Sequence, residues 1–139
     1  MRLHHTKNKG DLAVLKVQVD LYEQGYVCYT SVTEHQDFDL IAYKAGGVFK
    51  RIQVKYRSLS EKGTLDISLK QAWIDRQGTH SKEVNKEEID LFAVYCPETN
   101  ECYYFTPTAV NVYVSLRINN SKNNQQRNVK LAADYRRVP

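Results

Sequence analysis

Apolar residues recur at helical spacing near the start of the chain and at strand spacing after it. Between Lys9 and Gly25 they lie three or four residues apart, which predicts a helix with a buried face made of Leu12, Leu15, Val19 and Tyr22. Gly25 marks the end of that helix. Segments rich in β-branched and aromatic residues predict the strands that follow, at residues 26–31, 38–44 and 48–57. The Gly-containing turn at 45–47 would join the last two strands into a hairpin.

The second half of the chain is less regular. Residues 58–88 are polar and charged, and the apolar residues among them predict only one strand, near 64–69. The elements predicted after them are a hairpin of Ile89–Cys96 and Glu101–Thr106, an alternating strand from Val110 to Ile118, and a short helix at Val129–Arg137. This order predicts an α/β (α+β) fold in which helices flank a mixed central sheet.

Length and composition narrow the class of protein. The 139 residues predict a single domain, 1–139. The longest apolar run, Leu91–Cys96, is far shorter than the roughly 20 residues that span a bilayer, so we expect no membrane partner. The N-terminus lacks the apolar stretch of a secretory signal, and three cysteines without metal-ligand spacing suit a reducing compartment, which predicts a cytoplasmic protein. Cys96 and Cys102 are predicted to be buried thiols.

The net charge of +4 is unevenly distributed. Residues 44–70 hold seven Lys or Arg against two acidic residues, and residues 117–137 hold six against one. The rest of the chain is acidic overall. Such segregation predicts a partner that is a polyanion, although a solvated basic face would give the same pattern.

The first predicted hairpin brings polar side chains together. If the turn at 45–47 pairs its two flanking residues, Asp39 lies opposite Gln53 and Asp37 lies opposite Lys55. Strand alternation then puts Gln53 and Lys55 on one face of the sheet, beside Asp39. Asp37 would form either a cross-strand ion pair with Lys55 or part of a metal site, and the ion pair is favoured.

An acid, an amide and a lysine on one hairpin suit metal-assisted hydrolysis of a phosphodiester. Mg2+ prefers oxygen ligands and keeps several waters, so the Asp39 carboxylate with the side-chain oxygen of Gln53 or the carbonyl of Val54 would be sufficient, and we expect Mn2+ to substitute. Lys55 would orient the attacking water or stabilise negative charge. A general-base role is disfavoured, because nearby carboxylates should keep the pKa of Lys55 high.

Short motifs, in order along the chain, point to a known family. They are Lys9-Gly10-Asp11 opening a helix, Phe38-Asp39-Leu40, Gln53-Val54-Lys55, Asp90-Leu91-Phe92-Ala93-Val94-Tyr95 and Tyr103-Tyr104-Phe105-Thr106-Pro107. In this order the chain resembles the PD-(D/E)XK nucleases, and within them the homing endonucleases associated with group I introns. The resemblance implies a restriction-endonuclease-like core, Mg2+-dependent hydrolysis of duplex DNA, and a catalytic set of Asp11, Asp39, Gln53 and Lys55.

Two residues differ from the family's pattern or carry a second interpretation. Gln53 stands where the family has its name-giving acid, which removes one negative charge and should lower the affinity for the metal. Asp11 is implied as a further metal ligand. It would also lie in the first turn of its helix, where the helix dipole favours a carboxylate for any function.

Several basic and polar residues are candidates for DNA contact. Residues 58–88 are a predicted DNA-recognition insert that would form either a two-stranded ribbon for the major groove or a disordered polar loop, and the Asn/Gln-rich loop 119–128 has the same two interpretations. The proposed DNA-binding residues are Arg51, Arg57, Lys62, Lys70, Arg76, Gln77, His80, Arg117, Lys122 and Arg127. For Arg51 and Arg57 the alternative is a solvated basic edge strand.

Together these expectations favour a site-specific, Mg2+-dependent double-strand DNA endonuclease. Because one active site cuts one strand, double-strand cleavage implies a homo-oligomer, a dimer or a tetramer. The alternatives are a structure-specific nuclease similar to Holliday-junction resolvases and a non-catalytic nucleic-acid-binding module.

Overall fold

The computed structural model describes all residues except 1–5, 34, 84–85, 110–112 and 120–129. The chain opens with helix α1, Thr6–Glu23. The helix ends as predicted at Gly25, which has a positive φ of 92°. There the N–H of Gly25 donates to the carbonyl of Tyr22 and the N–H of Tyr26 donates to that of Leu21, the two hydrogen bonds of a Schellman cap.

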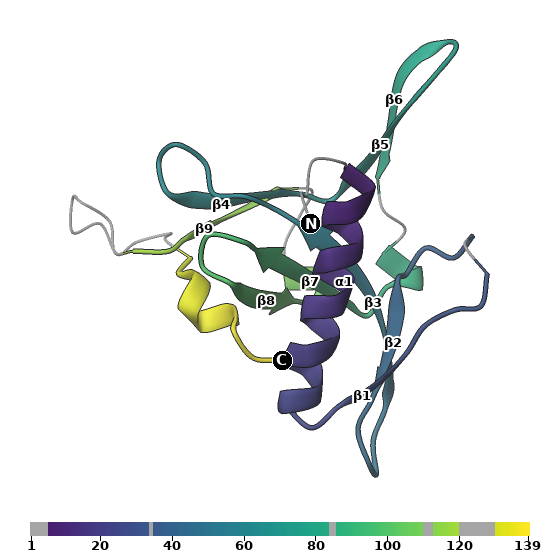
Figure 1. Cartoon of the computed structure of the whole chain (residues 1–139), viewed down its shortest axis with the longest axis vertical. Helices are drawn as coiled ribbons and strands as arrows, with labels where there is room; N and C mark the ends of the chain where they lie inside the picture. The colour runs from purple at the N-terminus through teal and green to yellow at the C-terminus, as the bar shows by residue number, and fades with distance from the viewer. Residues whose placement is uncertain (1–5, 34, 84–85, 110–112, 120–129) are drawn as a thin grey trace.

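A five-stranded mixed sheet forms the centre of the fold (Figure 1). Its strands, in spatial order, are β1 (Val27–Tyr29), β2 (Leu40–Tyr43), β3 (Phe49–Tyr56), β7 (Leu91–Cys96) and β8 (Glu101–Phe105). β3 and β7 run parallel, and all other neighbours run antiparallel. The predicted α/β (α+β) class with a mixed central sheet is confirmed, and so are both predicted hairpins.

Each face of this sheet packs on its own hydrophobic cluster. α1 covers one face, where Val17 and Leu21 meet Ile52 and Ala93. On the other face Phe92 and Phe105 stack with ring centroids 5.5 Å apart. Both faces of β7 are therefore buried, which explains its uninterrupted apolar sequence.

The region after β3 contains one core strand and one projecting ribbon. β4 (Thr64–Ser68) pairs antiparallel with β9 (Tyr113–Arg117), and Leu65 and Ile67 pack under the second face of the central sheet. The predicted strand near 64–69 is confirmed. Only β5 (Lys70–Asp75) and β6 (Gly78–Glu83) project from the body, as an antiparallel ribbon (Figure 1).

The remaining elements are short. They are the 3-10 turns Lys86–Glu88, Pro107–Ala109 and Ala132–Tyr135. The predicted C-terminal helix at 129–137 is therefore only a 3-10 turn within its described part. Cys96 and Cys102 are buried free thiols, as expected. No helix in the described ranges combines the length and apolar character that crossing a bilayer requires.

The sequence prediction chose the wrong face of α1. Ala13, Val17 and Leu21, four residues apart, are the buried positions, whereas Leu15 and Val19 are 60% and 59% exposed. The helix is apolar on two opposite faces, so periodicity alone could not identify the one that the sheet covers.

Candidate active site

The β2–β3 hairpin has the predicted register along its regular part. Tyr43 pairs with Phe49 next to the turn, and the ladder continues to Leu40 opposite Ile52. Gln53 and Lys55 lie beside Phe92 and Val94 of β7 and so face away from α1. The site is thus on the face opposite the helix.

The ladder leaves this register at Asp39. The N–H of Asp39 donates to the carbonyl of Ile52 at 2.8 Å, although Ile52 is already the partner of Leu40. A β-bulge places two residues of one strand opposite a single residue of the neighbouring strand, and it redirects the side chains there. Asp39 therefore does not pair with Gln53 as predicted. Instead its Oδ2 accepts the N–H of Val54 at 2.7 Å.

This hydrogen bond leaves the other oxygen of Asp39 free of protein partners among the described residues. Desolvation raises the pKa of the Asp39 carboxyl above its ordinary value, and the Val54 N–H and the positive charge of Lys55 offset this only in part. A carboxylate in this setting gains from binding an additional cation, because the cation would offset the cost of its desolvation.

Gln53 is buried, with 7% of its surface exposed. Its amide NH2 donates to the carbonyl of Asp37 at 3.2 Å, which fixes the orientation of the amide. The opposite atom, Oε1, is buried and accepts no hydrogen bond, the one such side-chain atom in the part of the chain that the structure describes. Burying an acceptor without a partner destabilises the fold by roughly 1–3 kcal/mol. A cation or a hydrogen-bond donor bound to Oε1 would remove this penalty.

Lys55 differs from its predicted behaviour. Burial, with a smaller contribution from the nearby Arg57, lowers its pKa to about 8, and Asp39 only partly opposes the shift. The expectation that carboxylates would keep this pKa high is wrong because desolvation dominates. The predicted ion pair with Asp37 is also absent from the described contacts, since β2 begins only at Leu40. Asp37 contributes its main-chain carbonyl instead.

Asp11 lies on α1, five residues after its first residue, Thr6. The helix begins earlier than predicted, so the carboxylate is outside the first turn and the helix-dipole interpretation does not apply. Its side chain is exposed, and over the described residues it forms no hydrogen bond or ion pair. The structure does not join Asp11 to Asp39, Gln53 or Lys55 by any direct contact.

The donors that the hairpin does bring together fit a divalent cation that prefers oxygen. They are the Asp39 carboxylate and the unpartnered Gln53 Oε1, with the main chain at Val54 between them. No group of three or more His, Cys, Asp or Glu side chains is placed to hold a metal within the described ranges. A cation here would therefore depend on amide, main-chain or water oxygens in addition to carboxylates.

Arg51 has a structural role that the sequence interpretation missed. Its side chain donates to Asp90 at 3.0 and 3.1 Å and approaches Glu88 at 3.4 Å, and its N–H also donates to Asp90. These bonds tie β3 to the start of β7, and they occupy the donors that were predicted to contact DNA. Local sequence carries no signal for this pairing, because Asp90 is 39 residues away and β3 and β7 become neighbours only in the fold.

Of the other predicted DNA-binding residues, one lies near the site and the rest lie in several distant segments. Arg57 is half-buried next to Lys55. Arg76 and Gln77 form the exposed turn of the β5–β6 ribbon, where Asp75 accepts hydrogen bonds from the Gln77 N–H and from His80. The remaining positions are Lys62 before β4, Lys70 in β5 and Arg117 in β9, whereas Lys122 and Arg127 lie outside the described residues.

Helix, mixed sheet and an Asp-Gln-Lys hairpin together define a restriction-endonuclease-like core. The PD-(D/E)XK endonuclease family model matches residues 4–138, and the chain belongs to this family. It is therefore a nuclease of a family whose members generally use divalent metal ions.

A solved structure of the same fold supports this assignment. The bacterial homing endonuclease I-Ssp6803I is 20% identical with a TM-score of 0.76, over 94% of this chain and 88% of its own. Hjc, a Holliday junction resolvase from Archaeoglobus fulgidus, is 15% identical with a TM-score of 0.49, over 78% and 84%. Comparison with curated proteins finds no match.

Proposed function

We propose that the chain is a site-specific, Mg2+-dependent endonuclease that cleaves both strands of duplex DNA, with Mn2+ as a substitute ion. The observation that carries the proposal is the buried, unpartnered Oε1 of Gln53, on the same hairpin as the Asp39 carboxylate and the low-pKa Lys55. The large majority of buried side-chain polar atoms in folded proteins have a partner, and a bound cation would supply one for this oxygen. The likeness in fold to a homing endonuclease supports the same activity.

Each residue has a distinct task in this proposal. Asp39, Gln53 Oε1 and the carbonyl of Val54 would hold the cation. A divalent cation polarises the scissile phosphate and acidifies water. Lys55 would accept a proton from the attacking water, because with a pKa of about 8 roughly a tenth of it is neutral at pH 7.

Recognition of DNA would fall to the β5–β6 ribbon and the basic residues around the site. A two-stranded ribbon fits the major groove, and its exposed turn carries Arg76 and Gln77, side chains suited to guanine and adenine edges. Half-buried Arg57, beside Lys55, would contact the scissile phosphate. Lys62, Lys70 and Arg117 would add phosphate contacts that are not specific for sequence.

A cleavage assay tests the activity. The purified protein is incubated with linear duplex DNA, a four-way junction and random-sequence duplex, in Mg2+ and in EDTA. We expect discrete duplex fragments in Mg2+ only. Cleavage of the junction alone would favour a resolvase, and binding without any Mg2+-dependent cleavage would leave a non-catalytic binding module.

Two substitutions with one matched control test the site. Asp39→Asn and Lys55→Ala should abolish cleavage while DNA binding, measured by fluorescence anisotropy, stays within about threefold. Asp134→Asn removes an exposed carboxylate far along the chain and should leave cleavage unchanged. Full cleavage by either hairpin variant would contradict the assigned site.

A further inference from the structure

α1 carries an apolar surface that no described part of the chain covers. Leu15, Val19 and Tyr22 are 60%, 59% and 73% exposed. At 3.6 residues per turn these three side chains fall within about 60° of one another, on the side of the helix opposite the buried Val17. We call them the outer stripe. A helix that is apolar on both sides is normally covered on both sides.

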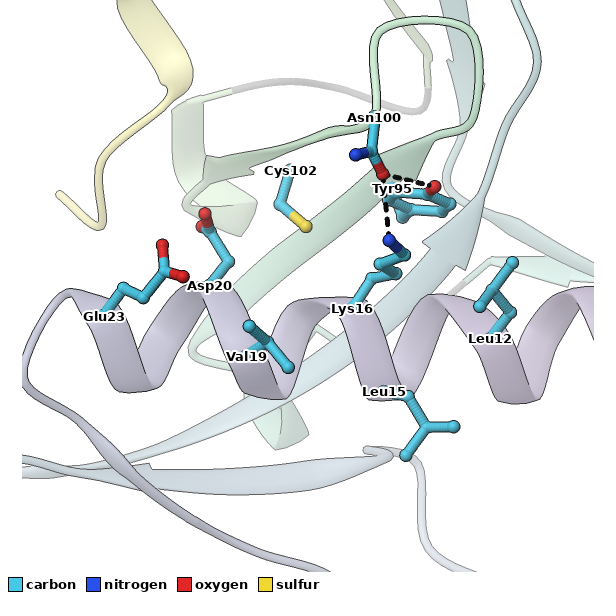
Figure 2. Close-up of a pocket in the computed structure, with 9 residues that line it drawn as sticks. All are labelled: Leu12, Leu15, Lys16, Val19, Asp20, Glu23, Tyr95, Asn100 and Cys102. Atoms are coloured by element: carbon cyan, nitrogen blue, oxygen red, sulfur yellow. Dashed lines mark hydrogen bonds between the residues drawn. The ribbon is translucent and has the colours of Figure 1, made fainter.

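A groove runs along this stripe, between α1 and the β7–β8 hairpin (Figure 2). It holds about 370 Å³, and Leu12 and Lys16 line it from the helix. Its other wall is held rigidly: the Lys16 ammonium and the Tyr95 hydroxyl both donate to the side-chain oxygen of Asn100, at 3.0 and 2.9 Å. Leu15 and Val19 of the outer stripe line the groove as well (Figure 2).

We infer that the outer stripe binds a second copy of this chain, with the two α1 helices packed antiparallel about a twofold axis. With the axis near the middle of the helix, Leu15 of each copy faces Val19 of the other, and Tyr22 reaches the groove beside Leu12. One patch then complements itself, as a twofold interface requires. A tyrosine that enters a preformed groove is a typical anchor of such an interface.

The charges along the groove favour this orientation. Lys9 and Lys16 lie toward the N-terminal half of α1, and Asp20 and Glu23 lie toward its C-terminal end, all on the same flank of the outer stripe. Asp20 already pairs with Arg136 at 3.7 Å within the chain, so Glu23 is the acidic residue available to a second copy. In an antiparallel pair the same flanks meet, so the basic half of each helix faces the acidic half of the other. In a parallel twofold pair these flanks would lie on opposite sides of the interface, so the contact between opposite charges would be lost.

The pairing goes beyond the proposed nuclease function and does not depend on it. The outer stripe faces away from the sheet, whereas Gln53 and Lys55 lie on the sheet face opposite α1. The pair therefore leaves both candidate sites open to DNA. Its formation can be measured without DNA or metal, so that failure of one proposal leaves the other intact.

Sedimentation equilibrium of the full chain in EDTA, from about 1 to 100 µM, tests the inference. We expect the wild-type mass to be at least twice that of the monomer, and Val19→Glu to halve it. Val32→Glu is the matched control, because Val32 is also an exposed valine, 101% exposed, outside α1. Circular dichroism verifies that both variants are folded. A wild-type monomer at 100 µM, or an unchanged mass for Val19→Glu, would overturn the inference.

Two further measurements test the antiparallel register. Glu23→Lys should weaken association about tenfold, and Lys9→Glu in the same chain should restore it. Separately prepared Leu15→Cys and Val19→Cys proteins, mixed under mild oxidation, should form a disulfide-linked dimer that Val32→Cys mixed with wild type does not form. Absence of that cross-link, or no rescue by the double charge swap, would refute the antiparallel arrangement.

Discussion

The low pKa of Lys55 leads to a prediction about how cleavage depends on pH. Burial lowers this pKa from 10.5 to about 8, so the neutral fraction of the amine rises from about 9% at pH 7 to about 91% at pH 9. If neutral Lys55 accepts the proton of the attacking water, the single-turnover cleavage rate should rise about tenfold over that interval and level off above pH 9.

Lys55→Arg serves as the matched variant, because it keeps the positive charge but does not titrate below pH 12. We expect its rate to fall by a factor of about 10² to 10⁴ and its pH profile to lose the rise. DNA affinity measured over the same pH range separates binding from chemistry. A wild-type rate that is flat or falls between pH 7 and 9, or a fully active Lys55→Arg, would refute the proton-accepting role.

Four further predictions follow from the hairpin and its surroundings. Gln53→Glu should show a larger Mg2+-induced rise in Tm than wild type. A second carboxylate near Asp39 raises the affinity for the metal, and repulsion between the two carboxylates destabilises the metal-free protein. An equal rise would argue against a metal at Gln53. Lys55→Met should raise Tm at pH 7, where the folded wild type carries the unfavourable buried charge of Lys55. This gain should fade from pH 8 to 10.5, because over that range the Lys55 ammonium loses its proton on folding and the buried charge is no longer present. Asp90→Ala should lower the free energy of unfolding by about 1–3 kcal/mol in urea titrations. Because the hydrogen bond from Arg51 lowers the pKa of Asp90, that difference should disappear as the pH falls below about 4. Arg76→Ala should weaken binding to the specific duplex by about 1–3 kcal/mol and relax its specificity, whereas unchanged specificity would exclude the ribbon tip as a base reader.

The structure also separates two kinds of basic residue that sequence cannot distinguish. Arg51 and Arg57 lie two positions apart on the same strand, and both were candidates for phosphate contact. The carboxylate of Asp90, 39 residues away in sequence, occupies the donors of Arg51, whereas Arg57 stays beside the candidate site. Long-range ion pairs of this kind depend on which strands become neighbours, and the local sequence pattern does not specify which strands those are.

Local pattern was sufficient for the central hairpin and the family. Alternation along 48–57 and the turn at 45–47 specify which residues of the two strands meet, since a slip by one residue would turn every apolar side chain outward. The same order of short motifs identified the PD-(D/E)XK endonuclease family, which the family model confirms. The helix stop at Gly25 is equally local, because few residues other than glycine adopt a positive φ there.

Only the tertiary structure decided the features that give the candidate site its chemistry. The bulge at Asp39, the unpartnered oxygen of Gln53 and the low pKa of Lys55 all depend on what packs around the hairpin. The same is true of α1, whose two apolar faces are equivalent in sequence until the sheet covers one of them. Hydrophobic period and turn chemistry act over a few residues, whereas desolvation and burial sum over contacts from the whole chain. The sequence therefore determined which residues form the hairpin, and the tertiary structure decided their electrostatic environment.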